Sequence, residues 1–492
     1  MIASWLISAP LSDPKDDMQL ALIVQLSIAM LAGELAGSLP ITASWCVVIA
    51  LLGPLLVYAI GALLARWAAR AMDQRRALIA DRFFGFCSRA HWIASVCILI
   101  AASGDLATAW LPVVGIAGIA GFLVSCGIAT SLVSSWNAWL LEQRIRESAI
   151  MRALDSASTL HAMPSRGAYV LAQARASLAP ILAPLIVPVL MSQIGFVIAV
   201  KYAPAFTEQA QIAGAVVGTA LLLLLVPVII PRLLGLRRLE AGEMRSDLED
   251  LARDARVGMS EIWVWPTNGL IANAAVMGII PGLRCVMLSD ALLECMPREQ
   301  VRAVMAHELG HVVHRHLLWL IVVVIACWSL AAIVMNALAL EAFTQYAANI
   351  KSQDMVETAH SFSLARDGAV LIAGLCAFGF ASRRCERQAD TFAVQLLSTR
   401  AGSRDATVAS VEAMVGALGS VALLNHVRPT RSSWRHGSIA WRQAYLRTLS
   451  GRAHAALGID LFVRVMCWSS LALVAWLLLN SIIDWTGGAT LN

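Results

Sequence analysis

Residues 297–316 read PREQVRAVMAHELGHVVHRH, and this stretch decides which fold and chemistry are expected of the chain. Pro297 suits the first turn of a helix, and apolar residues recur behind it at helical spacing. The sequence H-E-L-G-H places His307 and His311 four residues apart, so both imidazoles project from one helix face. Two such imidazoles can bind one Zn²⁺ at about 2.0–2.1 Å. Glu308 lies beside them, placed to accept a proton from a water molecule.

A third zinc ligand is predicted within residues 383–393, which read RRCERQADTFA. Glu386 and Asp390 are four residues apart on a predicted helix. Two histidines and one glutamate form a known catalytic zinc set that leaves a fourth position for water. Asp390 is then expected to orient a histidine ligand through its distal N–H. Without H-E-x-x-H, the same pair would be interpreted as solvated carboxylates among arginines.

Two more histidines follow the motif. His314 shares the face of His307 and His311, but seven residues of helix separate His314 from His307 by about 10 Å along the axis. Three histidines at that spacing cannot converge on one ion. We therefore interpret His314 and His316 as structural or interfacial residues.

The composition predicts an integral membrane protein. Of the 492 residues, 59% are hydrophobic and 14% are charged, whereas about 25% are charged in an ordinary soluble domain. This balance excludes a single soluble globule and intrinsic disorder. The net charge is +5 and no basic patch is interleaved with aromatic residues, so nucleic-acid binding is not expected. The ten cysteines form no C-x-x-C pair, which disfavours a disulfide framework or a thiolate metal site.

Nine membrane spans are predicted, because a helix needs roughly 20 apolar residues to cross the hydrocarbon core. They are residues 19–37, 44–65, 92–110, 112–140, 180–200, 211–231, 317–340, 368–382 and 462–484. With the N-terminus inside, the four arginine-rich loops 66–91, 142–178, 232–316 and 383–464 all lie on the cytoplasmic face. The seventh and eighth spans then form a hairpin that returns Glu386 to the membrane level of H-E-x-x-H.

The expected fold is therefore mostly α-helical: a polytopic bundle of about nine spans (seven to nine) with a cytoplasmic gluzincin-type catalytic domain that carries a small β-sheet. The runs EIWVW (261–265) and RCVML (284–288) predict strands of that sheet. Five segments are expected in chain order. They are an N-terminal transmembrane bundle (1–231), a catalytic segment with HExxH (232–316), a transmembrane hairpin (317–382), a catalytic segment with ExxxD and a late histidine (383–461), and a C-terminal transmembrane helix (462–492).

At these motifs the chain resembles the HtpX-like and CaaX-prenyl-protease-like membrane zinc peptidases, gluzincins in which HELGH is followed by ExxxD. The resemblance covers roughly residues 240–450. LARDARVG (251–258), IANAAVMG (271–278) and VMLSDALLE (286–294) follow the order of the family's catalytic segment. RHGSIAWRQAYL (435–446) resembles its late H-P-x-x-x-R-I-x-x-L element, with Gly437 in place of the usual proline.

The resemblance implies that His307, His311 and Glu386 bind one zinc ion per chain, with Glu308 as the general base and Asp390 as a support for the ligands. It also implies roles for three residues outside these motifs. Asn273 would lie on an edge strand that pairs with an extended substrate, His436 would help to stabilise the oxyanion, and Arg442 would support that substrate-binding region. From the residues alone, His436 is equally well interpreted as an ordinary loop histidine.

The predicted activity is zinc-dependent hydrolysis of peptide bonds in membrane-associated or lipidated protein substrates at the cytoplasmic membrane face. Arginine supplies 34 of the 37 basic residues, which favours a GC-rich bacterial source and hence the inner (plasma) membrane. Two alternatives stay open. A site-2-type intramembrane protease is disfavoured because the flanks of H-E-x-x-H are polar. A catalytically inactive membrane scaffold of the same fold is disfavoured because both motifs are intact. A transporter is less compatible still, because the predicted spans hold few ionisable residues.

Overall fold

The computed structural model describes residues 14–30, 32–73, 78–153, 163–177, 179–269, 271–347, 355–425, 427–453 and 458–488. The chain divides into two compact units. The first comprises Met1–Glu240 and Gly258–Met296, and the second comprises Ala241–Val257 and Pro297–Asn492. The stretch with HExxH and the stretch with ExxxD both belong to the second unit.

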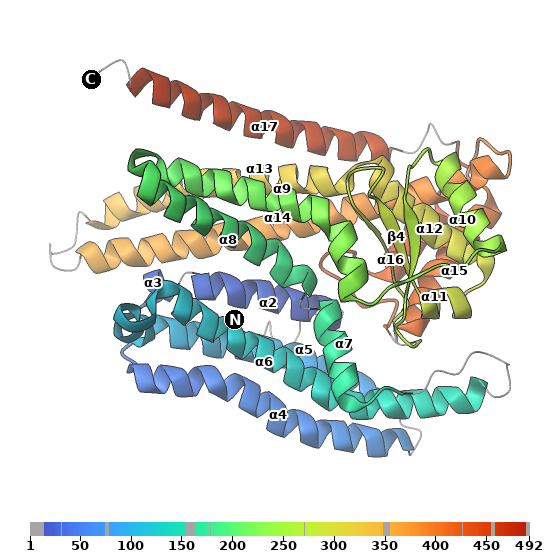
Figure 1. The fold of residues 1–492 in the computed structure, drawn as a ribbon, viewed down its shortest axis with the longest axis horizontal. Helices are drawn as coiled ribbons and strands as arrows, with labels where there is room; N and C mark the ends of the chain where they lie inside the picture. The colour runs from blue at the N-terminus through green and yellow to red at the C-terminus, as the bar shows by residue number, and fades with distance from the viewer. Residues whose placement is uncertain are drawn as a thin grey trace. The chain divides into compact units, whose positions relative to one another are not determined.

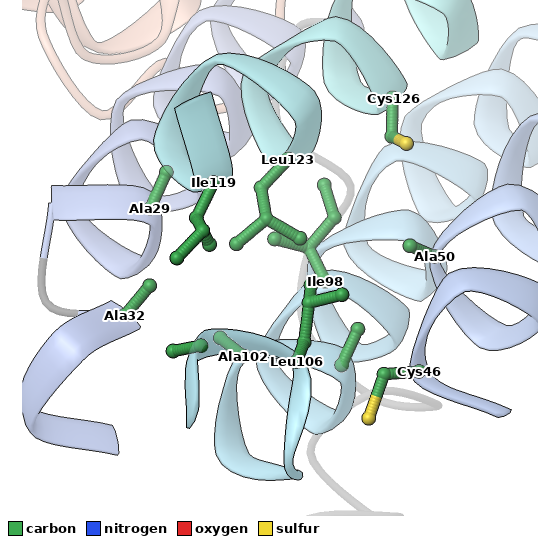
Figure 2. Close-up of a cluster of buried hydrophobic side chains, with 12 residues drawn as sticks. Ala29, Ala32, Cys46, Ala50, Ile98, Ala102, Leu106, Ile119, Leu123 and Cys126 are labelled. Carbon is green, nitrogen blue, oxygen red and sulfur yellow. The ribbon is translucent and has the colours of Figure 1, made fainter. Parts of the chain in front are cut away.

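Helices dominate the first unit (Figure 1). They are α2 (Pro14–Met30), α3 (Ala32–Leu35), α4 (Ala43–Asp73), α5 (Leu78–Ser103), α6 (Leu106–Ala153), α7 (Arg166–Ser177), α8 (Ala179–Tyr202), the 3₁₀ turn η1 (Pro204–Phe206) and α9 (Thr207–Leu233). Figure 2 shows Ile119 and Leu123 of α6 pointing toward Ile98 of α5. Alanines such as Ala29 and Ala50 complete this cluster, and small residues of this kind let helix backbones approach closely within a membrane.

Helices α8 and α9 form a hairpin joined by η1. Glycines occupy the contact between them, because a Cβ added at Gly195 would collide with the carbonyl oxygen of Ala210, and one added at Gly214 would collide with that of Met191. The two helices can pack this closely because glycine has no side chain at either position.

A four-stranded sheet completes the first unit, with strand order β1-β2-β4-β3. Its strands are β1 (Arg237–Arg238), β2 (Glu261–Trp265), β3 (Ala274–Met277) and β4 (Cys285–Ser289), and the short helix α11 (Asp290–Cys295) follows β4. β2 and β4 pair in parallel, with Glu261 opposite Cys285. β1 is antiparallel to β2 and β3 is antiparallel to β4. The predicted small sheet is confirmed, and β3 is one of its two edge strands, with β1 at the other edge.

The named elements of the second unit are all helices in the part that the structure describes, with one isolated β-bridge between Asp405 and Ala453. Its helices are α10 (Glu243–Asp254), α12 (Arg298–Val313), α13 (His316–Ala347), α14 (Met355–Arg400), α15 (Val408–Leu424), α16 (Ile439–Arg447) and α17 (Ile459–Gly488). α13 and α14 lie side by side as the predicted hairpin (Figure 1). α12 packs against α14, α15 and α10. Arg302 of α12 pairs with Asp247 of α10 at 2.5 Å between Nε and Oδ2.

Six helices among the described residues are long and apolar enough to cross a membrane. They are Ala43–Ala71, Gly118–Arg144, Pro204–Leu233, His316–Gln345, Ser361–Arg400 and Ile459–Asn480. The other three predicted spans, 19–37, 92–110 and 180–200, overlap shorter apolar helical segments at Leu20–Ala29, Arg89–Ser103 and Ile186–Tyr202. The predicted fold class, a mostly helical multi-pass membrane protein with a small sheet, is therefore confirmed.

Candidate metal centre

The two motif histidines converge on one side of α12. Pro297 stands at the N-cap of this helix. Proline has no backbone N–H to donate, and at a helix start that N–H would have no acceptor within the helix. His307 Nε2 and His311 Nε2 lie 3.2 Å apart, and the two rings meet edge to face with centroids 4.9 Å apart. This convergence is what the i, i+4 spacing predicts.

Glu386 of α14 brings the third donor to the same point. Its Oε2 lies 3.6 Å from His307 Nε2, and its Oε1 lies 3.7 Å from His311 Nε2. One ligand atom from each of the three residues lies within 4.8 Å of the other two. Tetrahedral zinc with bonds of about 2.0–2.1 Å separates its ligand atoms by roughly 3.3 Å. The observed separations and the two-nitrogen, one-oxygen donor set therefore fit a zinc ion.

Gly310, the glycine of HELGH, allows this close approach of α12 to α14. A Cβ added at Gly310 would lie 3.0 Å from Ala389 Cα and 3.2 Å from the ring of Phe392. Any larger side chain at position 310 would push the helix that carries Glu386 away from the two histidines. The contact therefore sets the distance between the first two donors and the third.

A buried ionic cluster of Asp390 and Arg442 contacts the metal-binding residues His307 and Glu386. Asp390 Oδ1 lies 2.9 Å from His307 Nδ1. Arg442 of α16 grips both carboxylates: its Nε and Nη2 bind Asp390 at 2.8 and 2.6 Å, and its Nη1 lies 3.0 Å from Glu386 Oε2. Asp390 is fully buried and Arg442 is 7% exposed. Arg442, which the family resemblance assigns to the substrate region, thus contacts the ligand carboxylate and its neighbour directly.

The imidazole of His436 also reaches the centre. Its Nδ1 lies 2.9 Å from Glu386 Oε1, and its side chain is 40% exposed. Ser433 and Gly437 exchange two backbone hydrogen bonds of 3.0 and 3.2 Å around His436, and Gly437 has a φ of +76°. Proline, with φ fixed near −65°, cannot adopt that conformation, which explains in backbone terms why glycine stands here.

The pKa values of the two histidines are shifted in opposite directions. Burial by itself would lower the pKa of His307, but Asp390 and Glu386 outweigh burial and raise the pKa to about 10. Burial also lowers the pKa of His311, and here it dominates, so the pKa falls well below its usual value. His311 is therefore neutral at pH 7, whereas His307 holds a proton that a metal ion must displace.

The remaining predicted residues are placed as follows. Glu308 follows His307 on α12 and is half-buried. Asn273 belongs to the first unit, where it directly precedes the edge strand β3 and accepts a backbone hydrogen bond from Ser289 at 2.9 Å. The structure thus brings His307, His311, Glu386, Asp390, Arg442 and His436 together within the second unit.

Sequence reasoning missed one member of this group. His316 Nδ1 lies 2.8 Å from His311 Nδ1, although we interpreted His316 as structural or interfacial. A continuous helix turns about 100° per residue, which would direct position 316 away from position 311. Arg315 has a φ of +53°, and this break between α12 and α13 redirects His316. The residue letters around it give no signal of that break, because arginine rarely adopts a positive φ.

Comparisons with known proteins agree with this site. Residues 238–448 match the family model described as Peptidase family M48. Protease HtpX of Chromohalobacter salexigens is 43% identical over 63 residues, which are 13% of this chain and 20% of that protein. A protease HtpX homolog of Sulfurihydrogenibium sp. is 33% identical over 79 residues, 16% of this chain and 26% of the relative.

The chain therefore spans about a fifth to a quarter of the length of these curated relatives. The crystal structure of S. mikatae Ste24p aligns with a TM-score of 0.40 and 18% identity, covering 83% of this chain and all of the other. The 238–448 match includes both motifs and the late 435–446 element. Residues 238–448 of this chain thus match peptidase family M48, and the predicted resemblance to the HtpX-like membrane zinc metallopeptidases is confirmed over this segment.

Proposed function

We propose that this protein is a membrane-embedded zinc endopeptidase that hydrolyses peptide bonds of membrane-associated or lipidated protein substrates. One observation carries the proposal: donor atoms of His307, His311 and Glu386 converge at zinc-ligand separations, although Glu386 is far from both histidines in the sequence. A structural role alone does not need two imidazoles and a carboxylate aimed at one point.

His307, His311 and Glu386 would hold the zinc ion. When bound, zinc acts as a Lewis acid that lowers the pKa of water and polarises a scissile carbonyl. Glu308, the neighbour of His307 on α12, accepts the proton of the attacking water and passes it to the leaving amine. His436, whose ring is partly exposed beside Glu386, donates a hydrogen bond to the developing oxyanion.

Asp390 and Arg442 position the ligands and do not touch the substrate. Asp390 Oδ1, 2.9 Å from His307 Nδ1, favours a proton on that nitrogen, so that Nε2 is the atom left to bind the metal once its own proton is displaced. Arg442 contacts both Asp390 and Glu386 and offsets part of their negative charge. We assign the extended substrate to the free edge of β3 beside Asn273, because an edge strand offers unpaired backbone groups for strand addition.

The side of the membrane follows from charge. The four arginine-rich loops all fall on the face of the predicted spans that carries both motifs, and this asymmetry favours a cytoplasmic active site, in a bacterial inner (plasma) membrane. A site-2-type intramembrane protease is supported less well, because α12 lies outside the six candidate spans of the described residues and carries Arg298, Glu299 and Arg302. The inactive scaffold is the alternative that experiment must separate from the enzyme.

The test uses the full chain purified in detergent, with a labelled unfolded protein such as β-casein as the substrate. Wild type is expected to bind one zinc ion and cleave. Glu308→Gln is expected to keep the zinc and lose cleavage, because the amide cannot accept the proton. His307→Ala is expected to lose both. A zinc-free wild type would contradict the enzyme and favour the scaffold, and full turnover by Glu308→Gln would contradict the assigned base.

A further inference from the structure

A chain of short contacts leads away from the distal nitrogen of His311. His311 Nδ1 lies 2.8 Å from His316 Nδ1. His316 Nε2 lies 2.9 Å from Gln388 Oε1, and Gln388 Nε2 donates to Asp460 Oδ1 at 2.7 Å. His316 is 2% exposed and Gln388 is 4% exposed, so the middle of this chain is shielded from water. Asp460 lies in the first turn of α17.

The donor and acceptor roles along this series of hydrogen bonds follow from the carboxylate of Asp460 at its end. An ionised carboxylate only accepts hydrogen bonds, so Gln388 must present its N–H₂ group to Asp460 and its carbonyl oxygen to His316. His316 must then donate from Nε2. A neutral imidazole with its proton on Nε2 accepts at Nδ1, so the proton between the two histidines belongs to His311 Nδ1.

That tautomer is the one a metal ligand needs. With its proton on Nδ1, His311 has a lone pair on Nε2, the atom that faces His307 and Glu386. His307 reaches the same state when the metal displaces its second proton, and its Nδ1 lies 2.9 Å from Asp390 Oδ1. Each motif histidine is therefore anchored to a carboxylate, His307 directly and His311 through two intervening side chains.

The break at Arg315 makes the chain possible. α12 ends at Val313 and α13 begins at His316, and the left-handed conformation of Arg315 turns the His316 ring back to the distal side of His311. Gln388 lies two residues after Glu386 on α14. The hydrogen-bond chain therefore joins the first turns of α13 and α17 to α14, all within the second unit.

We propose that His316, Gln388 and Asp460 are positioning residues that fix the tautomer and orientation of His311 for metal binding. This inference rests on the proposed zinc site. Partners of this kind behind a histidine ligand typically change metal affinity by 10–100-fold when removed. The effect operates through the affinity and geometry of the metal site, so it is measurable without a substrate.

The experiment measures zinc affinity by competition with a chromophoric chelator, and the visible spectrum of the Co²⁺-substituted protein. His316→Leu is expected to weaken zinc binding by about 10–100-fold and to change the Co²⁺ spectrum. His316→Asn retains an acceptor near the Nδ1 position and is expected to recover most of the affinity. His314→Leu is the comparison variant, because the His314 ring stacks on His316 with centroids 5.6 Å apart but lies outside the hydrogen-bond chain, and a smaller loss of affinity than in His316→Leu is expected.

The far end of the chain supplies a second test that leaves the His316 site intact. Asp460→Asn keeps an acceptor for Gln388 and is expected to bind zinc nearly as wild type does, whereas Asp460→Leu is expected to weaken binding. Gln395→Leu, on the same helix as Gln388, is the control for Gln388→Leu. Unchanged affinity and an unchanged Co²⁺ spectrum in His316→Leu and Asp460→Leu would overturn the inference.

The ¹⁵N resonances of the His311 ring separate this inference from the proposed function. In zinc-free protein with labelled histidine, the chain predicts a neutral ring protonated on Nδ1. Failure of the wild type to bind zinc would contradict the proposed function, and the tautomer of His311 would still decide the positioning role. A His311 ring protonated on Nε2 would overturn that role whether or not zinc binds.

Discussion

Arg442 and Asp390 form a buried bidentate ion pair, with Arg442 Nε 2.8 Å from Oδ2 and Nη2 2.6 Å from Oδ1 of Asp390. Arg442 also contacts Glu386 at 3.0 Å. One guanidinium thus bridges the two carboxylates of ExxxD and reduces the repulsion between these like charges. Two hydrogen bonds to one carboxylate require the planar fork of arginine, which lysine does not have.

Replacing Arg442 by leucine is expected to destabilise the protein by about 3–5 kcal/mol, because Asp390 and Glu386 would remain buried without their guanidinium partner. Arg442→Lys should recover part of the loss, because it keeps the charge but not the fork. The measurement is the thermal unfolding midpoint in detergent together with the zinc content. Arg447→Leu on the same helix is the control: Arg447 is 56% exposed and lies 4.0 Å from Glu412, and exposed pairs contribute about 0–1 kcal/mol. Equal unfolding midpoints for the two leucine variants would contradict the stabilising role of Arg442 beside the two buried carboxylates.

Gly310→Ala is expected to weaken zinc binding. The added methyl group would lie 3.0 Å from Ala389 Cα, so α12 and α14 must separate by a few tenths of an ångström and Glu386 must move away from His307 and His311. Gly419→Ala is the matched control, because it is another mid-helix glycine whose added Cβ meets only the flexible end of Gln443 at 3.4 Å. Alanine is favoured over glycine in a helix by roughly 1 kcal/mol, so the control should be neutral or stabilising. Zinc affinity and unfolding midpoint, measured on both variants, check this; a Gly310→Ala protein with wild-type affinity would show that the helix contact does not set the donor distance.

Gly437→Pro is expected to abolish cleavage while zinc remains bound. Proline cannot adopt the φ of +76° at this position, so the turn that presents His436 must rearrange, whereas the three ligands lie on α12 and α14. Peptidase assays and zinc analysis on the same preparation test this separation.

Alanine substitutions distinguish the backbone effect from crowding. Gly451 has a similar φ of +74° with open space around it, whereas a Cβ at Gly437 would lie 3.1 Å from the ring of Trp441. Gly437→Ala should therefore cost more stability than Gly451→Ala, which bears only the cost of about 1–2 kcal/mol for a left-handed residue. Cleavage at the wild-type rate by Gly437→Pro would remove His436 from the mechanism.

Zinc binding is expected to be proton-linked with one proton released near neutral pH. The pKa of His307 is raised to about 10 by Asp390 and Glu386 against the effect of burial, so its proton must leave when zinc binds. His311, whose pKa is lowered by burial, contributes none. The logarithm of the zinc association constant should rise by about one per pH unit from pH 6.5 to pH 8.5.

Calorimetry in buffers of different ionisation enthalpy counts that proton. Asp390→Asn is expected to reduce the number released, because removal of the neighbouring carboxylate lowers the pKa of His307. Release of no proton by the wild type, or of two, would contradict the assignment of the charge to His307.

The sequence alone predicted what depends on local helix geometry. His307 and His311 share a face because four residues make about one helical turn, and this holds wherever the helix lies. The apolar runs predicted helices of membrane-spanning length because burial in lipid requires them, and β2 and β4 followed from two short apolar runs. Ser289 begins α11 as its cap, so the end of β4 was also a local event.

Tertiary packing decided what lies between segments distant in the sequence. Glu386 meets His307 only because α13 and α14 fold back side by side and Gly310 lets α12 approach α14. Arg442 reaches both carboxylates from α16, and His316 reaches His311 through a single left-handed arginine. Composition and periodicity report how each segment orders its own backbone. The distances between those segments are set by the size of the side chains at the contacts where they pack, and at Gly310 by the lack of one.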